Sequence, residues 1–319
     1  MELIEKQQPK RDKENSSSGG VQPTVSVCVQ TYQHALYIKD CLDGILMQKT
    51  DFTIEILLRD DASNDGTAEI CKDYAARHPN KFNLLLYSEN QFVKGVKPLP
   101  DNVKRAKGKY IAMCEGDDYW TDPLKLQKQV DFLEQNAEYV ACFHKYKELV
   151  DGAFSEKILP DIEDDFVITK KNFFDKWYTK TLTVVFRKDV HSSIDYSMYE
   201  KHRDTTLFYE LLKINNAICL NFIAGVYRIH QGGIWSLKSK RDRDIAAYIH
   251  LEEIYYFNQE DENLKIKIKK VLYRLNLIAS YNTLLLLIKN SRSFYFKMYL
   301  LKKLLKKPVK DFRHRTGEE

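Results

Sequence analysis

The sequence lacks the motifs that identify several large classes of nucleotide-binding, metal-binding and membrane proteins. It contains no GxGxxG after its first predicted strand and no GxxxxGKS/T, so neither a dinucleotide-binding Rossmann site nor a P-loop is supported. Its six cysteines are scattered and none forms a CxxC pair, which argues against zinc and redox motifs. No segment approaches the run of about 18 apolar residues that spans a bilayer, and the N-terminus has no apolar signal core. We therefore expect a protein of the cytoplasm.

Charge is distributed unevenly along the chain. The 319 residues carry a net charge of +5, but the segment 263–315 contains 15 Lys and Arg residues against one acidic residue, so the remainder is net acidic. A basic tail of this kind indicates an anionic partner, either a membrane surface or a nucleic acid. Because apolar and basic residues are interleaved over 298–307, and no nucleic-acid-binding module is recognisable, we favour peripheral contact with the inner face of a membrane. A helical bundle that packs on the rest of the protein is the alternative.

Three regions are expected along the chain: a disordered polar leader (1–22), an α/β domain (23–238) and a basic helical extension (239–319). In the α/β domain, apolar β-branched runs alternate with segments of helical periodicity, which indicates a mainly parallel sheet with helices on both faces. Residues 151–165 are expected to form a loop, and Thr169 to begin a helix that reaches Trp177. The first strands are expected at 24–30, 53–58, 82–87 and 109–113.

An acidic cluster follows the strand at 109–113. Glu115, Asp117 and Asp118 bring three carboxylates within four residues, at the point where that strand should end. Adjacent carboxylates repel one another unless a cation lies between them, and the carboxyl ends of the strands are where open α/β sheets bind ligands. Mg²⁺ and Mn²⁺ prefer oxygen ligands and often bridge carboxylates and phosphates. We therefore predict a metal–diphosphate site at Asp117 and Asp118. A solvated acidic turn before the next helix is the alternative for an isolated pair.

Two further strands end in polar residues. The first ends in Thr31-Tyr32, and the second ends in Asp60-Asp61, followed by the turn residues Ala62-Ser63-Asn64-Asp65-Gly66. All three strand ends should open into one crevice. Together they resemble the family-2 glycosyltransferases, a large inverting group with the GT-A fold, and the likeness extends from about Pro23 to Ser236. The stretch from Glu115 to Pro123 is similar to that of bacterial members that build surface polysaccharides.

The resemblance implies a role for each of these residues. Asp61 would accept a hydrogen bond from a ring N–H of the base, which favours uracil, thymine or guanine over bases that present a lone pair there. Thr31 and Tyr32 would flank the base and ribose. Asp117 would reach the ribose or the metal, and Asp118 would ligate Mg²⁺ or Mn²⁺. Asp60, Ser63, Asp65 and Gly66 are instead expected to shape the turn. Glu115 stands where many relatives carry Asp, so its role is left open.

The resemblance also places two functional residues later in the chain. An inverting transfer needs one general base to take the proton of the acceptor hydroxyl, and Asp204 occupies the family's position for it. Arg203 replaces the Glu that usually precedes this base, and Asp204 could instead serve only as the N-cap of its helix. His230, in Tyr227-Arg228-Ile229-His230, would approach the diphosphate or the metal.

The resulting hypothesis is an inverting, metal-dependent glycosyltransferase of polysaccharide biosynthesis. Its partners would be a nucleotide-sugar donor, most simply a UDP-sugar, and a saccharide or lipid-linked acceptor, with no nucleic acid. Two alternatives stay open: a nucleotide-sugar-binding partner subunit without transferase activity, and a nucleotidyltransferase of related fold. The sugar, the acceptor and the linkage do not follow from the sequence.

Overall fold

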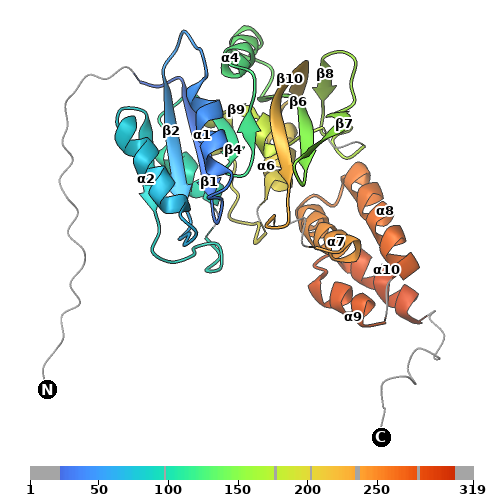
Figure 1. Ribbon diagram of the computed structural model, residues 1–319. Coiled ribbons are helices and arrows are strands. Elements are labelled where there is room, and N and C mark those ends of the chain that lie inside the picture. Colours follow the sequence, from blue (N-terminus) through green and yellow to red (C-terminus); the bar gives the residue numbers. More distant parts are fainter. Residues whose placement is uncertain are drawn as a thin grey trace, which may run out of the picture.

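A ten-stranded sheet forms the centre of the protein in a computed structural model that describes residues 22–305, apart from 97, 176–177, 202, 234–237 and 279–280 (Figure 1). The leader expected over 1–22 falls outside the described residues except for Gln22. Trp177 and the tail after Leu305 also lie outside them. The strand order is β3-β2-β1-β4-β9-β6-β10-β5, with β7 beside β6 and β8 beside β10.

The first half of the sheet is parallel, as the alternation of strands and helices predicts. Strand β1 pairs in parallel with both β2 and β4, and β2 pairs in parallel with β3. Parallel neighbours place all their carboxyl ends at the same edge, which is the geometry that a shared crevice requires. These strands are β1 (Val25–Thr31), β2 (Ile54–Asp60), β3 (Phe82–Leu86) and β4 (Tyr110–Glu115).

The second half of the sheet is mixed. Strand β6 pairs in parallel with β10, whereas β9 joins β4 and β6 by antiparallel pairing, and β5 lies antiparallel to β10. The long strand β10 shows register shifts in its pairing with β6 between Leu220 and Gly225. These strands are β5 (Tyr119–Trp120), β6 (Ala141–Val150), β7 (Ala153–Leu159), β8 (Phe166–Ile168), β9 (Val185–Arg187) and β10 (Ala217–Ile229).

Two local predictions in this half are wrong. The segment 151–165 contains strand β7, which pairs with β6, because an edge strand with one solvated face can carry charged residues such as Glu156 and Lys157. Residues 170–175 form turns rather than a helix. There, Thr169 and Asn172 exchange hydrogen bonds between side chain and backbone, which competes with helix formation.

Helices cover both faces of the sheet, so the sheet separates two clusters of core residues. One face packs against α1 (Ile38–Leu46), α2 (Thr67–Arg77) and α4 (Lys125–Gln135). The other packs against α3 (Pro98–Arg105), α5 (Lys188–Ser192) and α6 (Asp204–Ile214). Alternate residues of β1 face the two cores, with Val27 on the first side and Cys28 on the second, as the period of a strand requires.

The C-terminal helices continue the second core. Their buried side chains belong to the same cluster as those of α6, and the Tyr209 hydroxyl on α6 donates to Asp261 Oδ2 (2.8 Å). They lie together beyond the β6–β10 side of the sheet (Figure 1). None of the described helices combines the length and apolar character needed to cross a membrane. These helices are α7 (Lys240–Phe257), α8 (Glu262–Ile278), α9 (Tyr281–Asn290) and α10 (Phe294–Leu305).

Candidate active site

Polar residues gather where three neighbouring strands end. In the register of the sheet, Thr31 of β1 lies beside Asp60 of β2, and Gln30 lies beside Glu115 of β4. The backbone N–H of Asp61 donates to the carbonyl of Thr31 (3.0 Å). The turns that follow β1, β2 and β4 therefore meet at one edge of the sheet, where the sequence predicts a crevice.

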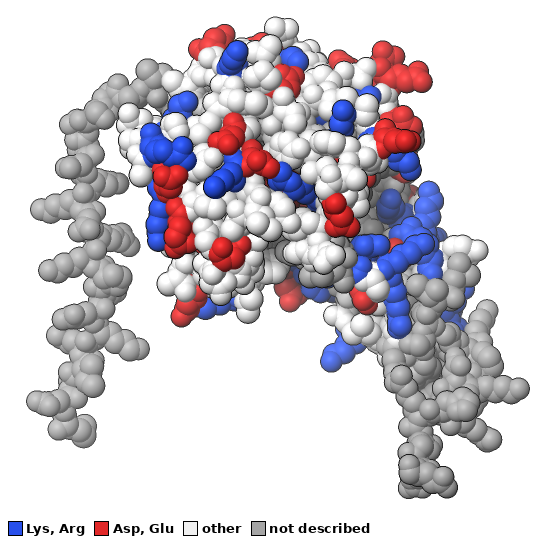
Figure 2. All heavy atoms as spheres, in the orientation of Figure 1, with Lys and Arg blue, Asp and Glu red and all other residues white. Residues whose placement is uncertain are grey.

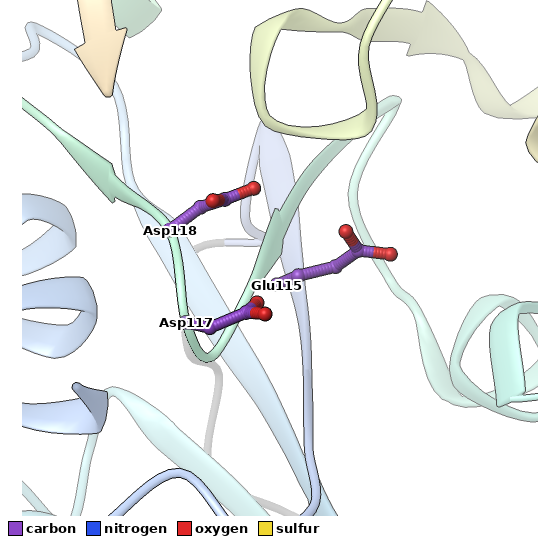
Figure 3. Close-up of side chains that lie close together, drawn as sticks. All are labelled: Glu115, Asp117 and Asp118. Carbon is purple, nitrogen blue, oxygen red and sulfur yellow. The ribbon is translucent and has the colours of Figure 1, made fainter. Parts of the chain in front are cut away.

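Three carboxylates come together in the turn between β4 and β5. One oxygen from each of Glu115, Asp117 and Asp118 lies within 4.8 Å of the others. Figure 3 shows the three side chains extending toward the same side of the turn. Gly116 allows this turn to pack tightly, because a Cβ at this position would lie 2.7 Å from Thr31 Oγ1 and 2.9 Å from His34 Nδ1. The cluster has the oxygen chemistry that a hard divalent cation prefers.

Asp118 is the most buried member of the cluster. Its Oδ1 accepts the backbone N–H of Arg228 (2.9 Å), while its buried Oδ2 has no hydrogen-bond partner among the described residues. Burial raises the pKa of Asp118 well above the usual value, and the charges of Asp117 and Glu115 raise it further. A buried carboxylate oxygen without a partner costs free energy, so this atom is suited to bind a cation.

Asp117 lies between two imidazoles. Its Oδ2 is 3.3 Å from His230 Nε2 and 3.7 Å from His34 Nε2. Burial alone would raise the pKa of Asp117, but the hydrogen bond to His230 and the charge of His34 outweigh it, so the pKa lies below its usual value. Burial in turn lowers the pKa of His34. Asp117 is therefore held as the ionised member of the cluster.

Glu115 connects the acidic cluster to helix α6. Burial raises the pKa of Glu115 to about 7, with further contributions from the charges of Asp117 and Asp204. Thr181 Oγ1 donates to Glu115 Oε2 (3.1 Å) from the 3₁₀ helix Thr181–Thr183. Because the charge of Asp204 acts on Glu115, the start of α6 lies within electrostatic range of the cluster.

Asp204 is the first residue of α6 rather than its cap. The N-cap position belongs to Arg203, so the alternative role of Asp204 as the N-cap is wrong. The Asp204 carboxylate accepts the N–H of the next residue, Thr205, through Oδ1 (2.7 Å). Its second oxygen, Oδ2, makes no hydrogen bond to the described residues.

Arg228 fastens the acidic turn to strand β10. Its Nη1 donates to the carbonyl of Asp117 (2.9 Å), and its guanidinium forms an ion pair with Asp40 on α1. The same guanidinium lies 4.5 Å from the ring centre of Tyr119 and 5.2 Å from that of Tyr37. One side chain thus joins β10, α1 and the β4–β5 turn.

Asp61 has several partners in the present conformation. Its Oδ1 accepts the N–H of Gln91 (2.9 Å) and its Oδ2 that of Phe92 (3.0 Å), and Arg59 Nη2 lies 3.2 Å from Oδ1. The carboxylate therefore fixes the start of the 91–96 loop beside the strand ends. As predicted, Asp60 shapes the turn by accepting from the backbone N–H and hydroxyl of Ser63 (3.0 and 2.5 Å).

Thr31 and Tyr32 differ in exposure. Thr31 is buried and its Oγ1 has no partner among the described residues, whereas the Tyr32 side chain is 44% exposed. The sequence did not single out His34, and gave Arg228 little weight. A lone His after a strand, and an Arg late in the chain, carry no spacing signal, so only the folded chain connects them to Asp117.

The chain is similar to known proteins in both sequence and fold. The family model described as "Glycosyl transferase family 2" matches residues 26–203. An uncharacterized protein of Mycobacterium tuberculosis is 33% identical over 225 residues, covering 66% of this chain and 60% of the relative, so the match spans about three fifths of that relative's length. The Escherichia coli protein WfaP, named a UDP-Glc:alpha-D-GlcNAc-diphosphoundecaprenol beta-1,3-glucosyltransferase, is 27% identical over 68% of this chain and 81% of its own.

A solved structure of TarS from S. aureus in complex with UDP-GlcNAc has a TM-score of 0.63, with 18% identity, and covers 91% of this chain and 89% of that chain. At this identity the likeness concerns the fold. It agrees with the central sheet and its parallel strands described above. The chain belongs to glycosyl transferase family 2 and has the GT-A fold.

Proposed function

We propose that the protein is an inverting glycosyltransferase of polysaccharide biosynthesis, which moves a sugar from a UDP-sugar to a hydroxyl of a saccharide or lipid-linked acceptor. The observation that carries the proposal is the acidic cluster. Its buried Asp118 Oδ2 has no partner among the described residues, and its Glu115 lies within electrostatic range of Asp204. The names of WfaP and of the TarS complex both include a uridine diphosphate sugar, which supports this choice of donor.

The nucleoside would bind at the ends of β1 and β2. Tyr32 is exposed and could stack on the base, and the buried Thr31 hydroxyl lacks a partner among the described residues. Asp61 is an acceptor. Its Oδ1 already accepts from both Gln91 and Arg59, whereas Oδ2 accepts only the N–H of Phe92 among the described residues and has a second lone pair. A uracil ring N–H is a donor and would match that lone pair, whereas cytosine presents an acceptor there.

The residues at the acidic turn fit a divalent cation, Mg²⁺ or Mn²⁺. Asp118 and Asp117 would hold it, with Glu115 beside them, and His230 would keep Asp117 ionised and oriented. When bound, the cation would neutralise charge that develops on the departing nucleoside diphosphate. Arg228 holds the turn in place through the Asp117 carbonyl.

The transfer is a single displacement. Asp204 takes the proton of the acceptor hydroxyl while that oxygen forms a bond to the anomeric carbon. The bond between the anomeric carbon and the diphosphate oxygen breaks, and its electron pair leaves with the nucleoside diphosphate. Attack opposite the leaving group inverts the configuration at that carbon.

The test compares Asp204→Asn, Asp118→Asn and a control, Asp131→Asn, at an exposed carboxylate on α4. We expect Asp204→Asn to lower transfer by about 10²–10⁴-fold with UDP binding intact. We expect Asp118→Asn to weaken Mn²⁺-dependent UDP binding in calorimetry, and the control to behave as wild type.

Turnover that is unchanged in Asp204→Asn would remove the assignment of the base. Tight UDP binding without transfer to any acceptor by the wild-type protein would favour a partner subunit. Release of pyrophosphate from a nucleoside triphosphate would favour a nucleotidyltransferase instead.

A further inference from the structure

The outer sides of α8 and α10 form a surface that is basic and apolar at once. We call it the α8–α10 face and define it by Ile266, Lys269, Lys270 and Tyr273 of α8 with Tyr295 and Tyr299 of α10. The side chains of Tyr273, Ile266 and Tyr295 are 67%, 46% and 41% exposed. A hollow of about 590 Å³ is lined by Ile266, Lys269, Lys270, Tyr273, Arg274 and Tyr299.

The spacing of these residues explains why the face is separate from the core. Positions 266, 269, 270 and 273 follow the i, i+3, i+4, i+7 pattern of one helix side. The opposite side of α8 packs into the core through Leu264, Ile268, Val271, Leu272 and Leu275, all at most 1% exposed. Helix α8 therefore carries apolar residues on two sides, and its solvent side has no covering element in the part of the chain that the structure describes.

The positive charge on this face is largely uncompensated. Within the described residues, Lys269 and Lys270 form no ion pair, unlike Lys265, which pairs with Glu262 (2.8 Å). The Lys269 Nζ instead lies 5.7 Å from the ring centre of Tyr295, and Lys303 Nζ lies 5.7 Å from that of Tyr299. Figure 2 shows Lys and Arg side chains gathered at the right of the molecule, at mid-height.

We propose that the α8–α10 face docks on a membrane surface that contains anionic phospholipids. Tyrosines with an apolar ring and a polar tip suit the boundary between headgroups and acyl chains, and lysines between them attract anionic headgroups. A nucleic acid could contact the lysines and tyrosines. It would leave the apolar side chains of Ile266 on α8 and Met298 on α10, which is 38% exposed, in contact with water. A membrane accounts for both the charge and the aliphatic residues. Such docking would bring an enzyme to an acceptor that is held in the bilayer.

The experiment is co-sedimentation of the full chain with vesicles. One set is pure phosphatidylcholine, and the other mixes phosphatidylcholine with phosphatidylglycerol. Three double variants are compared with wild type: Lys269→Gln with Lys270→Gln, Ile266→Ser with Tyr273→Ser, and a control with Lys72→Gln and Lys81→Gln on exposed lysines near α2. All of these side chains are exposed, and circular dichroism checks that each variant is folded.

We expect binding to the anionic vesicles only, with partitioning reduced about five-fold for each lysine removed from the face, the equivalent of about 1 kcal/mol per charge. The Ile266/Tyr273 variant should also bind more weakly, and the control variant should bind as wild type. Equal losses in the control and the face variants would overturn the proposal, as would unchanged binding of the Ile266/Tyr273 variant. Binding to an oligonucleotide but not to vesicles would overturn it as well. UDP binding, measured in parallel, separates this outcome from any failure of the proposed function.

Discussion

Lys125 follows the acidic turn closely in the sequence. Its replacement by Met should nevertheless stabilise the protein. Lys125 is the first residue of α4 and is completely buried, with no hydrogen-bond partner for Nζ among the described residues. Its Nζ lies 3.8 Å from the ring centre of Trp120. Burial lowers the pKa of Lys125 from 10.5 to about 7. Met has a similar length and shape and no charge, so it should fill the same space.

The magnitude follows from the difference between the folded and unfolded pKa values. At pH 7 the unfolded chain holds the proton almost fully, and in the folded chain the site is about half protonated, which costs about 4 kcal/mol of stability. The contact with the Trp120 ring favours the charged form by about 2 kcal/mol and opposes this cost. The burial cost is larger, so Lys125→Met should raise the free energy of unfolding by about 2–4 kcal/mol at pH 7.

The sign of the pH dependence is fixed by the same shift. The pKa of Lys125 is depressed in the folded state, so the unfolded state binds more protons between about pH 7 and the ordinary lysine value of 10.5. The stability of the wild-type protein should therefore rise with pH in this window, by about 2 kcal/mol between pH 7 and pH 9 from this group. The gain in the free energy of unfolding from Lys125→Met should therefore be smaller at pH 9 than at pH 7 by the same amount.

Urea unfolding at pH 7 and pH 9 measures both quantities. Lys128→Met is the matched control, because Lys128 is exposed on the same helix and pairs with Asp122 (2.6 Å). Its effect should not change with pH in this range. A difference between wild type and Lys125→Met that is the same at both pH values would show that the lysine stays charged in the folded protein, and would refute the reasoning.

Three further predictions concern the acidic turn. Arg228→Lys keeps the charge but loses the guanidinium geometry at the Asp117 carbonyl, so kcat for donor turnover should fall about tenfold. An unchanged kcat would contradict the positioning role of Arg228. Gly116→Ala should destabilise the protein by about 1–3 kcal/mol in urea, because its Cβ would lie 2.7 Å from Thr31 Oγ1. A loss of no more than about 0.5 kcal/mol, the range of ordinary surface substitutions, would argue against close packing. His230→Gln should raise the pKa of Asp117, so the acid limb of the pH–rate profile should move to higher pH, while a stationary limb would exclude this coupling.

The sequence predicts the first half of the site because local rules are enough there. Strand β1 ends at Thr31 and β2 ends at Asp60, and parallel pairing places both ends at one edge without further information. Helices α2 and α6, at 67–77 and 204–214, each bury residues whose spacing along the sequence is that of a helix. These elements depend on their own residues and on neighbours close in the sequence.

The rest of the site depends on contacts between distant segments. Arg228 meets Asp117 across 111 residues, and His34 meets Asp117 from a turn whose own sequence has no distinctive pattern. Strand β7 is mostly exposed and has Glu156 and Lys157 at its centre, so its own residues do not indicate a strand, and its pairing with β6 makes it one. Periodicity reports which side of an element is buried, and does not report which side chains from two elements will touch.

Strand β10 shows how the two halves of the site are coupled. The family model ends at residue 203, so Asp204, Arg228 and His230 follow the matched segment. Residues 225 and 226 of β10 pair with Trp120 and Tyr119 of β5, directly after the acidic turn. The register shifts before Gly225 set this pairing, and the pairing brings the Arg228 N–H to Asp118.

A shift of one residue in β10 would send alternate side chains to the opposite face. The Arg228 N–H would then leave Asp118, and His230 would leave Asp117. The geometry of the acidic turn therefore depends on contacts with a strand whose Arg228 lies 110 residues after Asp118 in the sequence. This dependence explains why the Asp-Asp pair alone does not predict the geometry of the acidic cluster, which the contacts of Arg228 and His230 hold in place.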